Sequence, residues 1–373
     1  MPPVNTGASS VVFYRHLKLL EQDGYKISVV VNEIGLKNAN SEIPKSWNTF
    51  VLPNRKWWYP PYKPTGLLKK VRYYLIYLKL FSFIKSNKPN IVIGCLYGIY
   101  LSGFCAFLSQ FLNIKLFMFY HDRAELLNYH GNQQMQKIIE IHNFEIINQS
   151  TKIWTVSEQL VYQKKGWENK FQVIYPIPEK LNFAAPIWKE NFAIAPIIGY
   201  AGTLYNEVVE IMIVIAKILK QLNGKLLILT NQTENVEKIK KQCDNIIYEQ
   251  KSTTYDACKY IYENCNAFLV AYPEKTEQMP WIDSCFPSKF TQFIHTGLPI
   301  IVVAPEDAAI SIWCQKSKWE GYSSQFESKK LKVFLQLLSQ KENWLKLSNQ
   351  SQAVSQHFFD PDKIHTLISK DIL

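Results

Sequence analysis

A short run in the last third of the chain combines residues that could bind a diphosphate. Pro287 and Ser288 are typical of the first positions of a helix, and Lys289 follows them directly. Backbone N–H groups at a helix start have no partner within the helix and attract negative charge. With a serine hydroxyl and a lysine ammonium added, the pattern predicts a site that neutralises a diphosphate without a metal ion. The alternative is an ordinary capped helix with a solvated lysine.

The residues after Lys289 indicate how far this helix extends. Apolar side chains recur three and four positions apart, which is the spacing of a buried helix face. Gly297 suits the left-handed cap that ends many helices, and Pro299 cannot continue one. We therefore expect a helix over residues 286–296 and a buried strand over residues 299–303.

A second polar group follows an apolar run that is typical of a buried strand. His121 and Asp122 come after the run 115–119. Open parallel sheets bind ligands at the carboxyl ends of their strands, so these two side chains are candidates for a catalytic pair. The alternative is a histidine that packs or caps at a strand end.

Two glycines could bring the backbone close to a phosphate or a sugar, because glycine has no side chain. Gly7 lies in a loop-like run near the start of the sequence, and Gly202 follows the apolar run 197–200 and precedes Thr203. Glycines after strands are often only turns, which is the alternative interpretation for both positions.

The first third of the chain contains a basic and aromatic segment. Between Arg55 and Lys88 there are nine Lys and Arg residues and no Asp or Glu, and the whole chain has a formal net charge of +11. Stretches of this kind dock on anionic lipid, whereas a surface helix with its aromatic residues packed on a sheet is the alternative. We expect the following residues on the acceptor or membrane side: Arg55, Lys56, Trp57, Trp58, Lys69, Lys70 and Arg72. Nucleic acid would suit the same charge, but no nucleic-acid-binding motif accompanies it.

Short β-branched runs alternate with longer helical patterns along most of the chain, which is typical of doubly wound parallel sheets. The expected strands are 26–31, 91–94, 115–119, 152–156, 172–175, 197–200, 225–229, 245–248, 267–271 and 299–303. The other expected helices are 9–22, 66–86, 98–112, 133–149, 158–165, 208–222, 234–241 and 255–264. Prolines interrupt the alternation around residues 176–195, as in interdomain linkers. We predict two such sheet domains, facing a cleft that binds the ligand.

Other features bear on metals and membranes. Residues 91–114 are uncharged and long enough to span a bilayer, but strand, helix and strand runs in and after this stretch fit a parallel sheet better. The seven cysteines form no C-x-x-C pair, and no signal-peptide pattern begins the sequence. We therefore expect a cytoplasmic protein with reduced thiols, no metal site and no transmembrane helix.

Pro287-Ser288-Lys289, followed by Gly297-Leu298-Pro299, resembles a motif of GT-B glycosyltransferases, especially family 4-like (group 1 type) enzymes. Other segments resemble this family in the same order over nearly the whole chain. They are Pro2-Pro3-x-x-Thr6-Gly7-Ala8-Ser9, Gly24-Tyr25-Lys26-Ile27-Ser28-Val29-Val30, Tyr120-His121-Asp122, Thr155-Val156-Ser157-Glu158, Val173-Ile174-Tyr175-Pro176 and Ile198-Gly199-Tyr200-Ala201-Gly202-Thr203. The resemblance implies a GT-B fold and a retaining, metal-independent transfer from a nucleotide-sugar.

The resemblance also implies roles for particular residues. The donor-binding residues would be Gly7, Gly202, Thr203, Pro287, Ser288, Lys289 and Gln292. His121 would contact the donor sugar, and Asp122 would orient an acceptor hydroxyl. We expect a UDP- or GDP-sugar as substrate, no cofactor, and a glycan or lipid-linked acceptor. The pathway would be cell-surface polysaccharide or glycoconjugate synthesis, with peripheral contact at the inner face of the cell membrane.

The implied domains follow the two halves of the alternation. Residues 1–178 would form an acceptor-side Rossmann-like domain and residues 179–195 the linker. Residues 196–350 would form the nucleotide-sugar-binding domain, and residues 351–373 a helical segment that packs back on the first domain. No strand precedes the first helix near Ser9, so we expect that the first strand is missing or that the true start lies upstream of Met1.

The sequence departs from the family pattern at charged positions. Family 4 enzymes often carry two glutamates where this chain has Ser284 and Gln292, and an Arg and a Lys where it has Leu204 and Tyr205. Lys289 is then the main phosphate cation. The departures keep two alternatives open: another GT-B enzyme such as a nucleotide-sugar epimerase, and a non-catalytic GT-B-like protein that binds a glycan or a partner transferase.

Overall fold

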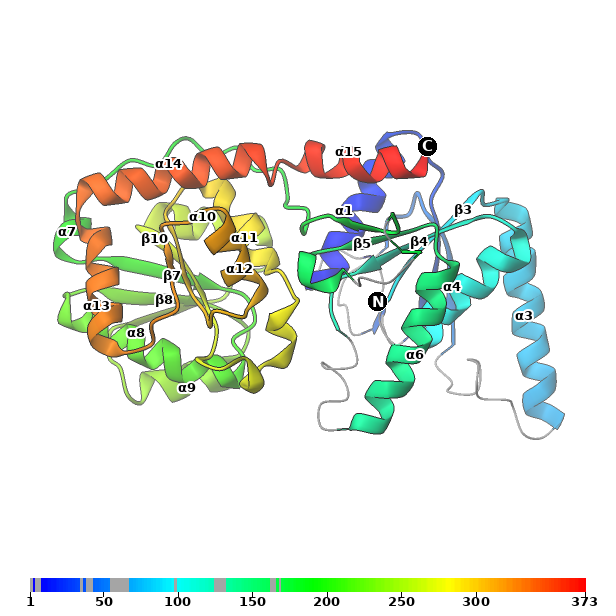
Figure 1. Ribbon diagram of the computed structural model, residues 1–373, viewed down its shortest axis with the longest axis horizontal. Helices are drawn as coiled ribbons and strands as arrows, with labels where there is room; N and C mark the ends of the chain where they lie inside the picture. Colours follow the sequence, from blue (N-terminus) through cyan, green and yellow to red (C-terminus); the bar gives the residue numbers. More distant parts are fainter. Residues whose placement is uncertain are drawn as a thin grey trace. The chain divides into compact units, whose positions relative to one another are not determined.

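The computed structural model describes residue 3 and residues 8–33, 36–37, 43–53, 67–96, 99–123, 132–161, 166–167 and 169–373. The chain divides into two compact α/β units (Figure 1). The first comprises Met1–Pro176 and His365–Leu373, and the second comprises Ile177–Ile364. Residues 179–195, for which the sequence predicts a linker, lie within the second unit.

The strands of the first unit that the structure describes are paired in parallel. Four of them hydrogen-bond in chain order: β3 (Ile91–Cys95), β4 (Lys115–Tyr120), β5 (Lys152–Thr155) and β6 (Phe171–Val173). Two others form a separate pair, β1 (Ser28–Asn32) and β2 (Asn48–Leu52). The strands expected in this half are confirmed. The sequence pattern missed β2, because only Leu52 of this strand is buried and no apolar alternation marks it.

Four long helices pack around these strands: α1 (Ala8–Gln22), α3 (Leu67–Asn87), α4 (Ile99–Leu112) and α6 (Gln133–Gln149). One core cluster joins α3, α4 and β2 through Leu52, Leu80, Ile84, Phe104 and Leu108. Helix α1 packs on β4, where the rings of Phe13 and Phe119 are 5.4 Å apart between centroids. The helix expected over residues 158–165 is only a 3-10 turn at Glu158–Leu160, and residues 162–165 lie outside the described residues.

The uncharged stretch 91–114 contains β3 and α4 rather than one continuous helix. Among the helices of the described residues, none is both long and apolar enough to cross a membrane. The strand and helix expected there are confirmed, since β3 pairs with β4 along its whole length.

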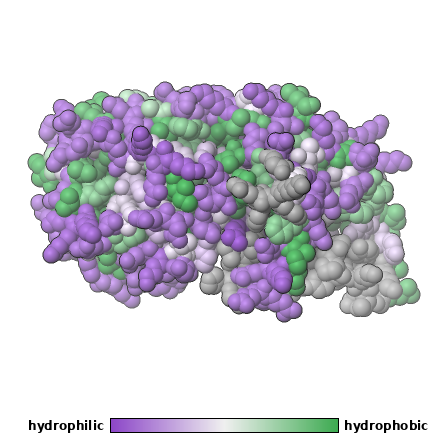
Figure 2. Space-filling view, viewed as in Figure 1, coloured by the Kyte–Doolittle hydropathy of each residue, from purple (hydrophilic) through white to green (hydrophobic). Residues whose placement is uncertain are grey.

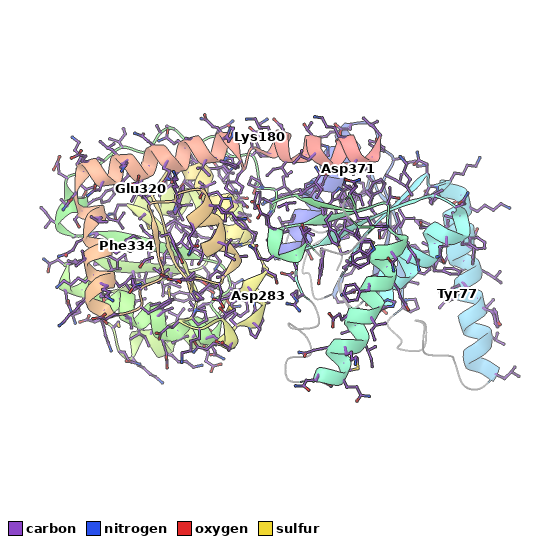
Figure 3. All side chains as sticks on the ribbon, in the orientation of Figure 1. Tyr77, Lys180, Asp283, Glu320, Phe334 and Asp371 are labelled. Atoms are coloured by element: carbon purple, nitrogen blue, oxygen red, sulfur yellow. The ribbon has the colours of Figure 1, made fainter. Side chains whose placement is uncertain are left out.

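The last helix, α15 (Pro361–Ile372), returns the end of the chain to the first unit. Asp371 of this helix (Figure 3) accepts a hydrogen bond of 2.7 Å from Nε1 of Trp154, a buried residue of β5. His365 Nε2 lies 2.8 Å from Oδ2 of Asp23, just after α1. Residues from the far end of the chain thus contribute to the packing of the unit that begins it.

The second unit contains a parallel sheet in the order β12-β11-β10-β7-β8-β9. Its strands are β7 (Ile197–Ala201), β8 (Lys225–Leu229), β9 (Ile246–Glu249), β10 (Ala267–Ala271), β11 (Ile300–Val303) and β12 (Tyr322–Ser323). Chain order runs outward from β7 on one side and from β10 on the other, so it reverses between these two strands. Ligands of open parallel sheets bind beside the carboxyl ends of strands at such a reversal.

Helices lie on both faces of this sheet, with α8 and α9 on one face and α10 and α14 on the other (Figure 1). The helices of the unit are α7 (Asn191–Ile194), α8 (Val209–Gln221), α9 (Thr233–Lys240), α10 (Thr254–Asn264), α11 (Ser288–Phe293), α12 (Ala309–Lys316), α13 (Ser328–Gln336) and α14 (Lys341–His357). The two-sided cover explains why the central strands are apolar along their whole length. Both units are therefore α/β, as the alternation in the sequence predicts.

Candidate functional site

Lys289 lies where the order of the second sheet reverses. It is the second residue of α11, which follows β10, and its side chain reaches the end of β7. Its Nζ donates a hydrogen bond of 3.0 Å to the hydroxyl of Tyr200 and lies 4.3 Å from the centroid of the Tyr200 ring. The structure therefore places the predicted phosphate cation at the sheet position where ligands of this architecture bind.

Tyr200 links Lys289 to the turn that follows β7. Its side chain is fully buried, and its hydroxyl donates a hydrogen bond of 2.6 Å to the backbone carbonyl of Thr203. One hydroxyl thus joins a lysine 89 residues away to a carbonyl three residues away. The sequence pattern gave no sign of a role for Tyr200, because a tyrosine within an apolar strand is typical of a buried core residue.

Gly202 forms the turn with a φ of +113°, a conformation that favours glycine. A Cβ at this position would lie 3.7 Å from Cε and 3.8 Å from Nζ of Lys289. The N–H of Gly202 already donates to the carbonyl of Leu229, at 2.9 Å. Gly202 therefore allows the turn conformation and leaves room for the lysine side chain. Its N–H group is hydrogen-bonded to β8 and does not point to a ligand.

Burial shifts the pKa values of Lys289 and Tyr200 in opposite directions. It lowers the pKa of Lys289 to about 7, because a partly buried ammonium loses hydration. It raises the pKa of Tyr200 well above its ordinary value, so the phenol stays protonated. A bound anion would favour the charged amine and raise the pKa of Lys289 again. The pair is therefore suited to a ligand with negative charge.

The helix that carries Lys289 is shorter than the sequence predicts. It spans Ser288–Phe293, with Pro287 at its N-cap, and continues as a 3-10 turn over Ile294–Thr296. Gly297 ends it in the left-handed conformation, with a φ of 70°, which confirms the predicted cap. Because few peptide dipoles add up in so short a helix, the Lys289 side chain is the main source of positive charge here.

Gln292 is buried, and its side-chain amide is bonded to the backbone of Glu179. Its Oε1 accepts a hydrogen bond of 2.7 Å from the Glu179 N–H, and its Nε2 donates one of 3.4 Å to the Glu179 carbonyl. An amide can both donate and accept, whereas an ionised glutamate can only accept. The glutamine thus fits its backbone partner, and its role in donor binding stays a prediction.

Leu204 and Tyr205 replace the cations that the family pattern places after the Gly202 turn. Leu204 is fully buried, and its N–H donates a hydrogen bond of 3.2 Å to the side chain of Gln232. Tyr205 is 41% exposed, and its ring packs edge-to-face on Trp281, at 5.9 Å between centroids. The turn therefore carries a core and an aromatic side chain where the family pattern has cations, and Lys289 is the cation beside Gly202.

His121 directly follows β4 in the first unit and is buried. Burial lowers its pKa to about 4, with nearby Asp122 opposing the shift. Its ring packs edge-to-face on Phe119, and His16 of α1 stacks on that same phenylalanine, at 5.2 Å between centroids. The imidazole of His121 is therefore neutral at neutral pH, and it can donate one hydrogen bond and accept another. Sequence reasoning missed His16, which lies in an ordinary helical pattern.

Several predicted site residues lie outside the described part of the chain. They are Gly7, Arg55, Lys56, Trp57 and Trp58. The side chains of Lys69, Lys70 and Arg72 are likewise not described, although their backbone belongs to α3. Within the described ranges no group of three or more His, Cys, Asp or Glu residues is arranged to hold a metal ion.

Comparisons with known proteins give structural matches only. No family model and no curated protein matches the sequence. Anabaena HepE, in a complex with UDP and glucose, matches with a TM-score of 0.64 and 11% identity over 100% of this chain and 96% of HepE. Phytolacca americana UGT2, in a complex with UDP-2-fluoro-glucose and pterostilbene, matches with a TM-score of 0.57 and 12% identity over 99% of this chain and 98% of UGT2. Acinetobacter baumannii MurG matches with a TM-score of 0.53 and 13% identity over 98% of this chain and 96% of MurG. At these identities the likeness shows the fold alone, which is GT-B.

Proposed function

We propose that this chain, which has the GT-B fold, transfers a sugar from a UDP- or GDP-linked donor to a glycan or a lipid-linked acceptor. The observation that supports this best is Lys289, held beside the Gly202 turn where the sheet order reverses, with its pKa lowered to about 7 by burial. A desolvated amine gains more from an anionic ligand than a solvated one, because water no longer competes for it.

In the proposed reaction, the bond between the anomeric carbon and the diphosphate oxygen breaks, that carbon bonds to the oxygen of an acceptor hydroxyl, and the proton of this hydroxyl is released to solvent. The nucleoside diphosphate leaves with one more negative charge. Lys289 in its charged form would donate a hydrogen bond to the leaving diphosphate, which stabilises charge that develops in the transition state. Transfer with retention, and without a metal ion, is part of this proposal and rests on the resemblance in sequence.

His121 and Asp122 have the chemistry to bind hydroxyl groups. The imidazole of His121 is neutral at neutral pH because burial lowers its pKa to about 4, so it can donate to or accept from a sugar hydroxyl. The carboxylate of Asp122, which directly follows it and is partly exposed, can accept a hydrogen bond from an acceptor hydroxyl. We therefore assign these residues to the sugar and the acceptor, respectively.

The surface of α3 supports a peripheral contact with anionic membrane. Five apolar side chains recur along one side of this helix and are exposed: Leu67, Val71, Tyr74, Leu75 and Leu78. Figure 2 shows hydrophobic surface over α3, at the right edge of the view. The helix contains no acidic residue. An apolar stripe on a basic helix suits the boundary between lipid headgroups and acyl chains, which would bring a lipid-linked acceptor within reach at the cytoplasmic face.

One alternative function has an observation in its favour. Leu204 is fully buried where the family pattern has a cation, and Gln292 is bonded to the Glu179 backbone. A GT-B-like protein that binds a glycan or a partner protein without catalysis would tolerate both changes. Such a protein would bind its partner without hydrolysing or transferring any nucleotide-sugar.

Binding and turnover by the full chain separate these functions. We expect UDP or GDP, but not CMP, to raise the melting temperature, and we expect slow hydrolysis of the matching nucleotide-sugar. Lys289→Ala should lower the turnover rate by about 100-fold, as loss of one donor to a developing anion does elsewhere. Lys240→Ala is a matched control, since Lys240 also lies over a tyrosine ring, at 5.1 Å from the Tyr248 centroid. Full activity in Lys289→Ala would remove the role given to Lys289, and a wild type without binding or turnover would favour the non-catalytic alternative.

A further inference from the structure

The hydroxyl of Tyr200 is an unusual feature of the strand that carries it. Tyr200 is fully buried among apolar neighbours of the central sheet, where a phenylalanine would fill nearly the same space. A buried hydroxyl is costly unless it is hydrogen-bonded. This one has two partners, Nζ of Lys289 at 3.0 Å and the carbonyl oxygen of Thr203 at 2.6 Å.

The direction of these two hydrogen bonds is fixed by chemistry. A carbonyl oxygen can only accept, so the phenol proton points to Thr203. The phenol keeps this proton, because burial raises the pKa of Tyr200 well above its ordinary value. A lone pair of the phenol oxygen is then left for Lys289, whose amine must donate. The phenol therefore accepts from the amine of Lys289 and donates to Thr203.

We infer that the Tyr200 hydroxyl is a positioning group that holds Nζ of Lys289 over the Gly202 turn, ready for the diphosphate. This inference rests on the proposed function. A free lysine side chain loses rotamer entropy when it is fixed, which opposes ordering of the amine by the ligand alone. Tyr200 places the amine before the ligand arrives, and the turn beside it is held by the same phenol, through Thr203.

The aromatic ring and the hydroxyl make separate contributions. The ring face attracts the ammonium, whose nitrogen lies 4.3 Å from the ring centroid. Tyr200→Phe keeps this face and removes only the hydroxyl. The amine would then lose its acceptor in a partly buried place, so its pKa should fall further and its orientation should become variable.

Chemical labelling tests this inference without any nucleotide. The rate at which acetic anhydride modifies Lys289 is measured against pH by mass spectrometry, in the full chain. In Tyr200→Phe the midpoint should move to lower pH than in the wild type, whereas a merely structural role would leave it unchanged. The control is Tyr262→Phe, which also removes a phenol that donates to a backbone carbonyl, that of Ala184 at 3.1 Å. An unchanged midpoint in Tyr200→Phe would overturn the inference.

Measurements of the affinity for a nucleoside diphosphate test whether Tyr200 contributes to binding through Lys289. Tyr200→Phe should weaken binding of the preferred nucleoside diphosphate by about five- to tenfold, the effect of one hydrogen bond. In the Lys289→Ala background the same substitution should have no effect, because Tyr200 acts through Lys289. Equal losses in both backgrounds would overturn the inference.

Two further outcomes keep the test decisive. If Tyr200→Phe does not fold, 3-fluorotyrosine at position 200 keeps the shape and makes the phenol a weaker acceptor, so the labelling midpoint should again fall. If the wild type binds no nucleoside diphosphate but its labelling midpoint shifts in Tyr200→Phe, the positioning of Lys289 holds and the proposed function fails.

Discussion

At neutral pH the amine of Lys289 is divided between its charged and neutral forms, because burial lowers its pKa to about 7. Its hydrogen bond to Tyr200 is compatible with either form, since both can donate. A diphosphate interacts strongly only with the charged form. Binding must therefore be coupled to proton uptake, and this coupling is a property of one residue and its immediate surroundings.

The affinity of the wild type for its nucleoside diphosphate should therefore fall as the pH rises above about 7. The free lysine is increasingly neutral there, while in the complex the anion raises its pKa. Between about pH 8 and 9 the dissociation constant should increase about tenfold, as expected for one obligatory proton. Isothermal titration calorimetry in buffers of different ionisation enthalpy measures both the affinity and the proton uptake. Lys289→Ala should abolish the trend and Lys240→Ala should retain it; a trend that persists in Lys289→Ala would assign the proton to another group.

At the scale of elements, α3 has two apolar sides with different neighbours. One side contributes Leu80 and Ile84 to the core of the first unit. The other side exposes Tyr74, Leu75 and Leu78, at 66%, 51% and 64%. Folding of the unit explains the first side only. We propose a lipid surface as the partner of this exposed side, on the basis of its aromatic and aliphatic residues and the lack of acidic residues in the helix.

Substitution of Tyr74, Leu75 and Leu78 by serine should weaken binding to vesicles that contain phosphatidylglycerol by at least about tenfold, since each buried apolar side chain contributes about 1.5–3 kcal/mol. Co-sedimentation with vesicles measures this. The matched control replaces three exposed apolar residues of the second unit, Val333, Leu337 and Leu345. Equal binding by both triple variants, or no binding by the wild type at physiological salt, would contradict a membrane role for α3.

At the scale of the whole molecule, the chain ends in the unit where it begins. Residues His365–Leu373 belong to the first unit, and Asp371 accepts from the buried indole of Trp154 at 2.7 Å. Lys152 lies 3.8 Å from the same carboxylate. The fold of the first unit therefore depends on residues that are almost 200 positions further along the chain than the last strand of its sheet.

Asp371→Ala should destabilise the first unit by about 1–3 kcal/mol, because it leaves the buried Trp154 N–H without its acceptor. The second unit should keep its stability. Hydrogen exchange read by mass spectrometry separates the two, since protection should fall in β5 and stay unchanged in β7 and β10. Asp362→Ala is the control, as the Asp362–Lys180 pair is exposed and lies in the second unit. Equal loss of protection in both units would show that Asp371 has no specific role in the first.

Some features of the candidate site could be read from local sequence. The position of Lys289 after Pro287 and Ser288 predicts a cation at a helix start, and the helix pattern before Gly297 predicts the left-handed cap found there. The apolar run before His121 likewise predicts that this residue follows a strand, which is β4. These features depend on neighbours within one or two turns of chain, whose backbone preferences are local.

The residue pattern alone predicts the alternation of strands and helices, hence two parallel-sheet units, and the position of Lys289 at the start of a helix. Which side chains meet depends on how the strands and helices pack. Tyr200 lies 89 residues before Lys289, and Gln292 bonds a backbone 113 residues away. Nothing in local propensity couples such distant positions. The physical reason is that strand order and packing bring β7 beside β10, and this arrangement places the phenol of one strand under the lysine that follows the other.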